Sequence, residues 1–477
     1  MIMSIKYLSR RSFHRWVVLM VVIASMMSCK DSFLDEANPQ SVGFDYVKDL
    51  ESLTTASVGV YSAFNGANYY GRTFLVTPEL MGDNAFISIR NGGRYLNQNQ
   101  FTITNGDGYV TGAWTLMWSV IANANLALDA GNAIEFSSQD QSAANQILGE
   151  LYACRALAYF DLVRFFAQPY NFTEDASHLG VPLVTESSDE LLYPARASVA
   201  EVYQQIIADL KQAETLLSPA VKDGFFNLYG AQSLLAKVYL YMEDWANADL
   251  YASKVIDQGP YTLLSRADYV ESWSGKYSSE SIFEIGYTPN DINGANSIGY
   301  LTEQGGYGEL LATKDLYEIY TNDDIRKLLI QPGRRVDGED EAFFIRKYPR
   351  GSTTNDDNIK VLRLSEVYLI RAEARAESAI AGAQADLNRI VQRADPGASN
   401  ITLTGQDLVD RILLERRKEL AFEGNRLFDL NRKKMNLTHI QSDQVRTFEY
   451  PNNRFIMPIP YSERNANPNI EQNPGWN

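Results

Sequence analysis

The chain has 477 residues, of which 43 are basic and 59 acidic, so its formal net charge at pH 7 is −16. Such an acidic balance excludes binding to nucleic acid or to anionic lipid by general electrostatic attraction. With three histidines and two cysteines, the chain has almost no material for a histidine-rich metal site or a disulfide framework. We therefore expect no cofactor and no metal.

The first predicted element is an N-terminal export signal, residues 1–28. Basic residues precede the apolar run 16–23, and small residues follow it, as in a secretory signal peptide. The run is shorter than the roughly 20 residues that a transmembrane helix needs. Ser28 before Cys29 suits a lipoprotein signal peptidase, so we expect cleavage there and acylation of Cys29 by chains such as palmitate. The alternative is an ordinary secreted protein with an incidental cysteine.

Residues 64–113 form the first of two long segments rich in Gly, Asn, Tyr and Ser, and residues 265–310 form the second. Both contain short strand-like runs and turn pairs such as Asn-Gly. Loops of this length on a rigid scaffold are usually functional or disordered, and the abundance of Tyr and Trp argues against disorder. The sequence therefore predicts two ordered, loop-rich insertions.

The scaffold between these insertions is predicted to be helical. Residues 228–242 place apolar side chains at intervals of three and four, and a second helix follows until Gly259 and Pro260 stop it. Ala236, Tyr239 and Ala248 have the spacing of a tetratricopeptide repeat. A looser copy spans "SEVYLIRAEARAES" and "ADLNRIVQRA", and further helices are expected around 146–166 and 198–217. Cys154 lies in one of these apolar runs, so we expect a buried, unpaired thiol.

Two acidic clusters, "NDD" at 322–324 and at 355–357, lack the ligand spacing of a calcium-binding loop, and we expect solvated turns at both. Further on, Thr404 with Asp407 three residues later has the pattern of a capping box. Charges of both signs follow at positions that favour salt-bridged packing over ligand binding. These residues are Glu415, Arg416, Glu419, Glu423, Arg426, Asp429 and Arg432.

Four runs together resemble the SusD/RagB family of outer-membrane nutrient-binding lipoproteins. The runs are "CKDSFLDEANP", "LSEVYLIRAEARAE", "ERRKELAFEGNRLFDLNRKK" and "RFIMPIPYSERNANPNIEQNPGW". The resemblance extends from Cys29 to the last residues, and Lys30-Asp31 resembles a signal for export to the cell surface. It implies a mainly α fold, a tetratricopeptide-repeat scaffold with loop-rich, strand-poor insertions. It also implies a single domain over 29–477, with an N-terminal part of about 29–220 and a C-terminal part of about 221–477.

The family resemblance also implies a function. Its members bind nutrient and do not catalyse; they close as a lid over a SusC-like TonB-dependent barrel and pass oligosaccharides, or sometimes peptides, inward. The implied partners are that barrel, an oligosaccharide and the outer membrane through the lipid, but not nucleic acid. The alternatives are peptide binding by the same mechanism and a surface glycan-degrading enzyme, since the chain has enough carboxylates for a catalytic pair.

Composition alone selects the ligand-binding candidates. A sugar ring has an apolar face and a rim of hydroxyls, so its site needs an exposed flat ring beside polar side chains. Loops 83–95 and 273–307 contain the best mixtures of such residues. The candidates are Asp83, Asn84, Arg90, Arg94, Tyr95, Trp273, Tyr300 and Tyr307. Among them, Trp273 has the least apolar neighbours in sequence and is the favoured platform.

Overall fold

The computed structural model describes residues 46–441 and 444–476. Residues from Val47 onward form one compact unit, and the description below concerns that unit alone. The predicted signal peptide, the lipidated Cys29 and the Lys30-Asp31 export signal lie outside the described residues. Among the described helices, none combines the length and the apolar character needed to cross a membrane.

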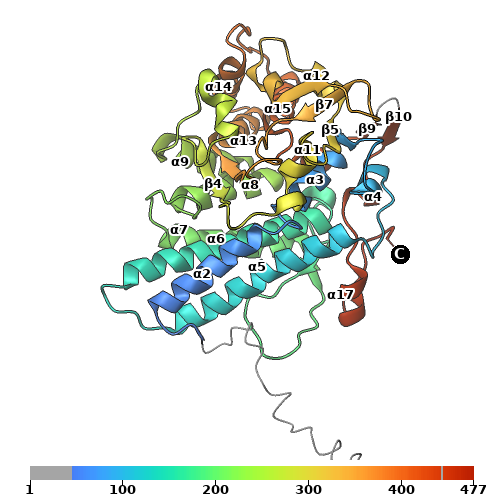
Figure 1. The fold of residues 1–477 in the computed structure, drawn as a ribbon. Coiled ribbons are helices and arrows are strands. Elements are labelled where there is room, and N and C mark those ends of the chain that lie inside the picture. Colours follow the sequence, from blue (N-terminus) through green and yellow to red (C-terminus); the bar gives the residue numbers. More distant parts are fainter. Residues whose placement is uncertain (1–45, 442–443, 477) are drawn as a thin grey trace, which may run out of the picture. The chain divides into compact units, whose positions relative to one another are not determined.

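Four long helices pack side by side in the N-terminal half (Figure 1). They are α2 (Leu50–Phe64), α5 (Gly108–Ala133), α6 (Gln141–Phe166) and α7 (Val199–Leu216). Side-chain caps start several of them: Asp49 accepts from the Ser52 backbone N–H, and Ser198 and Glu201 form a capping box. Cys154 in α6 is buried and unpaired, which confirms its prediction.

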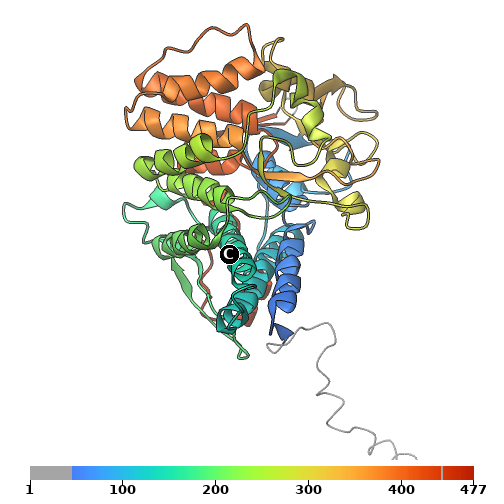
Figure 2. The same cartoon turned by 90° about the vertical axis from the view of Figure 1, so that its left-hand side faces the viewer.

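The helical scaffold continues with five helices that pack in succession (Figure 2). They are α8 (Leu228–Tyr241), α9 (Trp245–Gln258), α13 (Leu364–Glu377), α14 (Ala383–Ala394) and α15 (Gly405–Leu420). Ala236 and Ala248 are fully buried, as small residues are where paired helices approach closely. The predicted helices are confirmed, including the stop at Gly259. Their assignment to tetratricopeptide repeats stays a prediction.

Short strands and short helices occur in the predicted insertions 64–113 and 265–310, as the sequence predicted, and also in segments outside them. An antiparallel sheet has the order β1-β5-β7-β6, with strands Ala85–Ile87, Leu310–Ala312, Ala342–Ile345 and Ile330–Gly333. Three two-stranded antiparallel sheets pair β2 (Leu179–Pro182) with β3 (Arg196–Ser198), β4 (Ser281–Ile285) with β8 (Ile359–Arg363), and β9 (Leu437–Gln441) with β10 (Gln444–Phe448). The short α-helices are α3 (Thr73–Leu80), α4 (Leu96–Gln100), α10 (Arg266–Tyr269), α11 (Ile298–Thr302), α12 (Lys314–Glu318), α16 (Arg426–Arg432) and α17 (Tyr461–Ala466). The 3-10 turns are η3 (Tyr170–Phe172), η4 (Glu271–Trp273), η5 (Gly294–Asn296), η6 (Ile325–Leu329) and η7 (Asn453–Phe455).

The charged C-terminal run packs inside the protein. Buried Glu79 accepts backbone N–H groups from Phe422, Gly424 and Asn425, which fixes the turn between α15 and α16. Arg416 pairs with Asp429 at 2.8 Å. The predicted salt-bridged packing of this run is therefore confirmed.

Two local predictions are wrong. Thr404 precedes α15 with extended backbone, but its side chain makes no capping hydrogen bond, because Gly405 turns the chain into the helix at a φ of +58°. The "NDD" turns are solvated only in part: Asn322 and Asp323 are exposed, but each cluster also contains a buried carboxylate. Asp324 is 2% exposed and pairs with Arg326 and Lys418, whereas Asp356 is 6% exposed and pairs with Lys276. One carboxylate of each cluster is therefore an ion-pair partner of nearby cations.

Candidate functional site

The two predicted ligand loops meet because strand β1 pairs with strand β5. The pairing is antiparallel, with Ile87 opposite Leu310, and the Ser88 N–H donates to the Glu309 carbonyl at 2.8 Å. Residues that follow β1 therefore lie beside residues that precede β5. This register brings Arg94 to Tyr307, although more than two hundred positions separate them in the sequence.

Arg94 and Tyr307 form the centre of the site. The guanidinium carbon of Arg94 lies 3.4 Å from the centroid of the Tyr307 ring, a cation–π contact. Arg94 Nη1 also donates to Glu309 Oε1 at 3.0 Å. The Tyr300 ring meets Tyr307 edge to face at 4.8 Å. Both tyrosines are half-buried, so part of each side chain remains accessible to solvent.

The chain around Tyr300 and Tyr307 holds the two rings in a tight turn. Ser297 caps α11 by accepting from the Tyr300 N–H, and the Tyr307 N–H donates back to the Tyr300 carbonyl at 2.7 Å. A Cβ on Gly306 would lie 2.3 Å from that same carbonyl oxygen, so the turn requires glycine there. The rings are therefore positioned by backbone geometry as well as by packing.

A second aromatic pair, Tyr95 and Tyr109, extends the site. Their rings stack with centroids 3.9 Å apart and an interplanar angle of 16°. Tyr95 is fully buried and its hydroxyl accepts from Arg72 Nε at 3.0 Å, whereas Tyr109 is half-buried. Burial raises the pKa of Tyr109, and the nearby charges of Arg72 and Arg94 act in the opposite direction. The predicted candidate Tyr95 thus supports another ring, Tyr109, which the sequence reasoning missed.

Arg90 connects the site to the segment that follows β6. Its guanidinium donates to the Val336 carbonyl and lies 3.6 Å from Asp337. Arg335 in turn donates from Nη2 to the carbonyls of Arg90 and Tyr307, at 2.8 and 2.9 Å. Arg335 therefore joins the site, although no local sequence pattern marked it.

We name this surface the tyrosine–arginine face. It consists of Arg72, Arg94, Tyr109, Tyr300, Tyr307 and Arg335. Four of the predicted residues, Arg90, Arg94, Tyr300 and Tyr307, form or adjoin it, and a fifth, Tyr95, lies beneath it.

Asp83 and Asn84 lie elsewhere and bind the C-terminal run. Asp83 Oδ1 is 2.5 Å from Arg426 Nε, and Asn84 Oδ1 accepts from Arg417 Nε at 3.0 Å. Burial acts to raise the pKa of Asp83, but the charges of Arg426 and Arg417 outweigh it and lower the pKa. These contacts are a structural role for both side chains.

Trp273 is an interior side chain. It is 5% exposed and packs with Tyr269 and Leu329, and Lys347 Nζ lies 4.4 Å from its ring centroid. The expectation of an exposed ring at Trp273 is therefore wrong. Its polar neighbours in sequence gave a misleading signal, because residues distant in sequence cover the ring.

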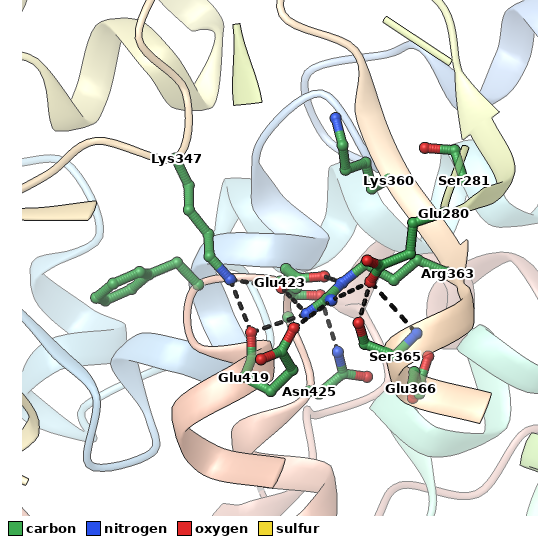
Figure 3. A network of polar contacts seen from close by, with 12 residues as sticks. Glu280, Ser281, Lys347, Lys360, Arg363, Ser365, Glu366, Glu419, Glu423 and Asn425 are labelled. Carbon is green, nitrogen blue, oxygen red and sulfur yellow. Dashed lines mark hydrogen bonds and ion pairs between the residues drawn. The ribbon is translucent and has the colours of Figure 1, made fainter. Parts of the chain in front are cut away.

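Trp273 borders a buried cluster of charges, since the guanidinium carbon of Arg363 lies 5.9 Å from its ring centroid. We name the cluster around Arg363 the interior charge network (Figure 3). Arg363 reaches three carboxylates: Glu280 at 3.1 Å, Glu419 at 2.7 Å and Glu423 at 2.7 Å. Burial acts to raise the pKa of Glu419, but the charges of Arg393, Arg363 and Arg326 outweigh it and lower the pKa well below its ordinary value. Carboxylates held ionised between arginines stabilise the packing and are poorly suited to donate protons.

A hollow of about 360 Å³ lies beside the β1-β5-β7-β6 sheet. Phe86, Ile89 and Phe343 contribute apolar lining. The charges at its rim are already paired, Glu341 with Lys314 at 2.8 Å and Asp340 with Arg334 at 3.0 Å. The hollow offers an apolar surface but no free polar group of the kind found on the tyrosine–arginine face.

Comparison with known proteins agrees with this fold. A model of the SusD family matches residues 330–476, and a second model, described as starch-binding associating with outer membrane, matches residues 32–240. SusD-like protein P2 of Formosa agariphila is 25% identical over 96% of this chain and 99% of its own length.

Solved structures give the same result. A SusD superfamily protein from Bacteroides vulgatus is 30% identical, with a TM-score of 0.83 over 90% of this chain and all of its own. A SusD-like carbohydrate binding protein from the same species is 25% identical, with a TM-score of 0.76 over 89% of this chain and 97% of its own. The chain belongs to the SusD family.

Proposed function

We propose that this protein is a cell-surface lipoprotein that binds an oligosaccharide and delivers it, as a lid, to a SusC-like TonB-dependent transporter in the outer membrane. The observation that carries the proposal is the tyrosine–arginine face. Half-buried tyrosine rings lie there beside guanidinium groups, which is the combination that a sugar ring with an apolar face and hydroxyl edges requires. The outer-membrane description of the matching family model and the carbohydrate-binding relative support it.

The rings and the polar groups have separate roles in this proposal. Tyr109, Tyr300 and Tyr307 provide flat apolar area, and their stacking and edge-to-face contacts limit the conformational entropy lost on binding. Arg94 and Arg335 provide N–H donors at the rim for ring oxygens and hydroxyls. For delivery, the ligand must favour the closed state of lid and barrel over the open state.

Calorimetry with the variant Tyr307→Ala tests the binding proposal. Loss of the central ring should weaken oligosaccharide binding by about tenfold or more, since a well-packed aromatic side chain contributes over 1 kcal/mol at a binding site. Tyr193→Ala is the matched control, because Tyr193 is 48% exposed on a different loop. Equal affinity of Tyr307→Ala and wild type for every oligosaccharide bound would contradict the assignment of this site.

Two further measurements test the anchor and the partner. Cys29→Ala should leave a folded protein that is lost from outer-membrane fractions, whereas unchanged surface labelling would contradict lipidation. In mild detergent the wild type should co-purify with a much larger barrel, through an interface that buries over ~2,000 Å². Native mass spectrometry that shows only the free chain would contradict the lid.

The alternatives have distinct outcomes in the same experiments. Product analysis after incubation with glycans would reveal an enzyme. Competition by peptides for the bound saccharide would reveal peptide binding on the same face.

A further inference from the structure

The tyrosine–arginine face contains cations that lack acidic partners, in a chain with a net charge of −16. Arg72 is 5% exposed, and its acceptors are the Tyr95 hydroxyl and the Asn296 side-chain oxygen, at 3.0 and 3.4 Å. Within the described residues, no carboxylate lies at ion-pair distance from Arg72 or Arg335. Buried or half-buried guanidinium groups without a counter-charge are costly.

Other buried arginines of this protein are satisfied more fully. Arg155 has a carboxylate of Asp209 at 2.6 Å, and Arg432 has one of Glu373 at 2.6 Å. Arg196 also lacks a carboxylate within the described residues. Its guanidinium instead donates to four backbone carbonyls, those of Gly180, Glu471, Phe166 and Leu179. Arg72 has neither arrangement.

The carboxylates close to the face do not neutralise it. Glu309 is held by Arg94 Nη1 and by the Gly92 N–H. Glu339 accepts from the Ser88 hydroxyl and the Ile89 N–H, both at 2.7 Å, and Asp337 lies beside Arg90. Glu339 acts on Arg335 as a nearby charge without pairing with it, so the four guanidinium groups of Arg72, Arg90, Arg94 and Arg335 face three carboxylates and one positive charge is left in excess.

The lowered pKa of Arg335 also indicates that its positive charge is incompletely compensated. Burial lowers the pKa of its guanidinium, and the nearby carboxylates of Glu339 and Glu309 only partly offset this effect. A bound anion would offset the remaining cost of burying the charged guanidinium of Arg335.

We propose that the ligand of the tyrosine–arginine face is an anionic saccharide, whose ring lies on the tyrosines and whose carboxylate or sulfate group meets Arg335 and Arg94 above Arg72. This inference rests on the function proposed above and specifies its substrate class. A planar guanidinium binds either anion through paired N–H donors. Uronic acids and sulfated sugars supply the two anions on the same kind of ring.

Calorimetry with four probes tests the inference: an oligogalacturonate, its carboxyl-reduced neutral analogue, a sulfated galactan oligosaccharide and a malto-oligosaccharide. At least one anionic probe should bind about tenfold or more tightly than the neutral ones, because hydrogen bonds to charged groups are the stronger class. Added salt should weaken binding of the anionic probe only. Preference for the oligogalacturonate identifies a carboxylate, and preference for the galactan identifies a sulfate.

Adjacent arginines provide the variant and its control. Arg335→Gln should remove about tenfold of the affinity for the anionic probe and weaken neutral probes by a clearly smaller factor, because these lose only a hydrogen bond between uncharged sugar groups and the guanidinium. Arg334→Gln should change neither, because Arg334 is 73% exposed and pairs with Asp340. Circular dichroism of both variants checks that they fold.

The failure of this inference differs from the failure of the proposed function. Neutral probes that bind as tightly as anionic ones, or equal losses for both in Arg335→Gln, overturn the inference and leave glycan binding intact. If none of the four probes binds, the result contradicts both the anionic-ligand inference and the proposed glycan-binding function.

Discussion

Two groups of arginines in this protein differ in what surrounds them. In the interior charge network, Arg363 contacts three carboxylates and Arg326 pairs with Asp324, Glu415 and Glu419. On the tyrosine–arginine face, Arg72 and Arg335 bond to neutral oxygens. Cations that are fully paired with carboxylates stabilise a fold and are unavailable to a ligand, whereas the half-buried Arg335 has no carboxylate at ion-pair distance within the described residues. The distinction separates arginines that stabilise the fold from arginines that we propose to bind the ligand.

The largest expected loss of stability comes from a substitution at Glu419, in the centre of the interior charge network. Glu419 accepts from Arg326, Arg363 and Arg393, at 2.9, 2.7 and 2.6 Å. Glu419→Gln should lower the free energy of unfolding by about 3–5 kcal/mol, because it leaves buried guanidinium charges uncompensated. Urea denaturation followed by circular dichroism measures the change.

Glu341→Gln is the control for that experiment. Glu341 pairs with Lys314 at the surface, so its loss should cost less than about 1 kcal/mol. Similar small losses in both variants would show that the network does not stabilise the fold.

The next effect concerns Trp273, which borders the same network. Because its ring is 5% exposed, Trp273→Ala should cost about 3 kcal/mol, at the lower end of the range for buried aromatic truncations. Affinity for saccharide should remain unchanged under conditions where the variant is folded. A melting temperature equal to that of the wild type, together with lost binding, would return Trp273 to the ligand site.

The contrast between Trp273, which is buried, and Tyr307, which is partly exposed, shows which features of the protein could be predicted from its sequence. Helices such as 228–242 were predictable because their apolar period is local, and the family resemblance predicted the fold class. Arg94, Tyr300 and Tyr307 were selected as candidates because aromatic and polar residues cluster in their loops, and the structure places them in contact. Burial of Trp273, and the parts played by Arg72, Tyr109 and Arg335, depend on pairings such as β1 with β5 that no local pattern reveals.

A smaller loss of stability is expected for a variant on the tyrosine–arginine face, Arg335→Gln. Arg335→Gln removes a guanidinium bonded to two backbone carbonyls at a half-buried position. Its free energy of unfolding should fall by less than about 1 kcal/mol, as at most sites outside the core. Chemical denaturation beside Glu419→Gln gives the direct comparison. A loss as large as that of Glu419→Gln would place Arg335 with the structural arginines.

Another small effect is expected at Asp357, a partly buried carboxyl beside the segment that leads into Tyr300, where stability should depend on pH. Asp357 accepts from the Arg350 N–H at 3.0 Å, next to the point where Gly299 and Gly351 cross. Burial raises its pKa to about 7, with the charges of Glu303 and Asp356 adding to the rise and Arg350 opposing it. Since this pKa is above the unfolded value of about 3.9, the contribution of Asp357 to stability is fully present below that value. It is lost as the pH rises through 7.

Between about pH 5 and about pH 8 the wild type should therefore lose on the order of 1 kcal/mol of its free energy of unfolding, a loss that Asp357→Asn should not show. The loss is small because the loop can admit water and reduce the cost of burying the charged carboxylate. Parallel denaturation curves across this pH range measure it, with Asp340→Asn, a residue with an exposed side chain, as the control. If Asp357→Asn shows the same slope as the wild type, the carboxyl is already ionised at the lower pH and does not govern the support of Tyr300.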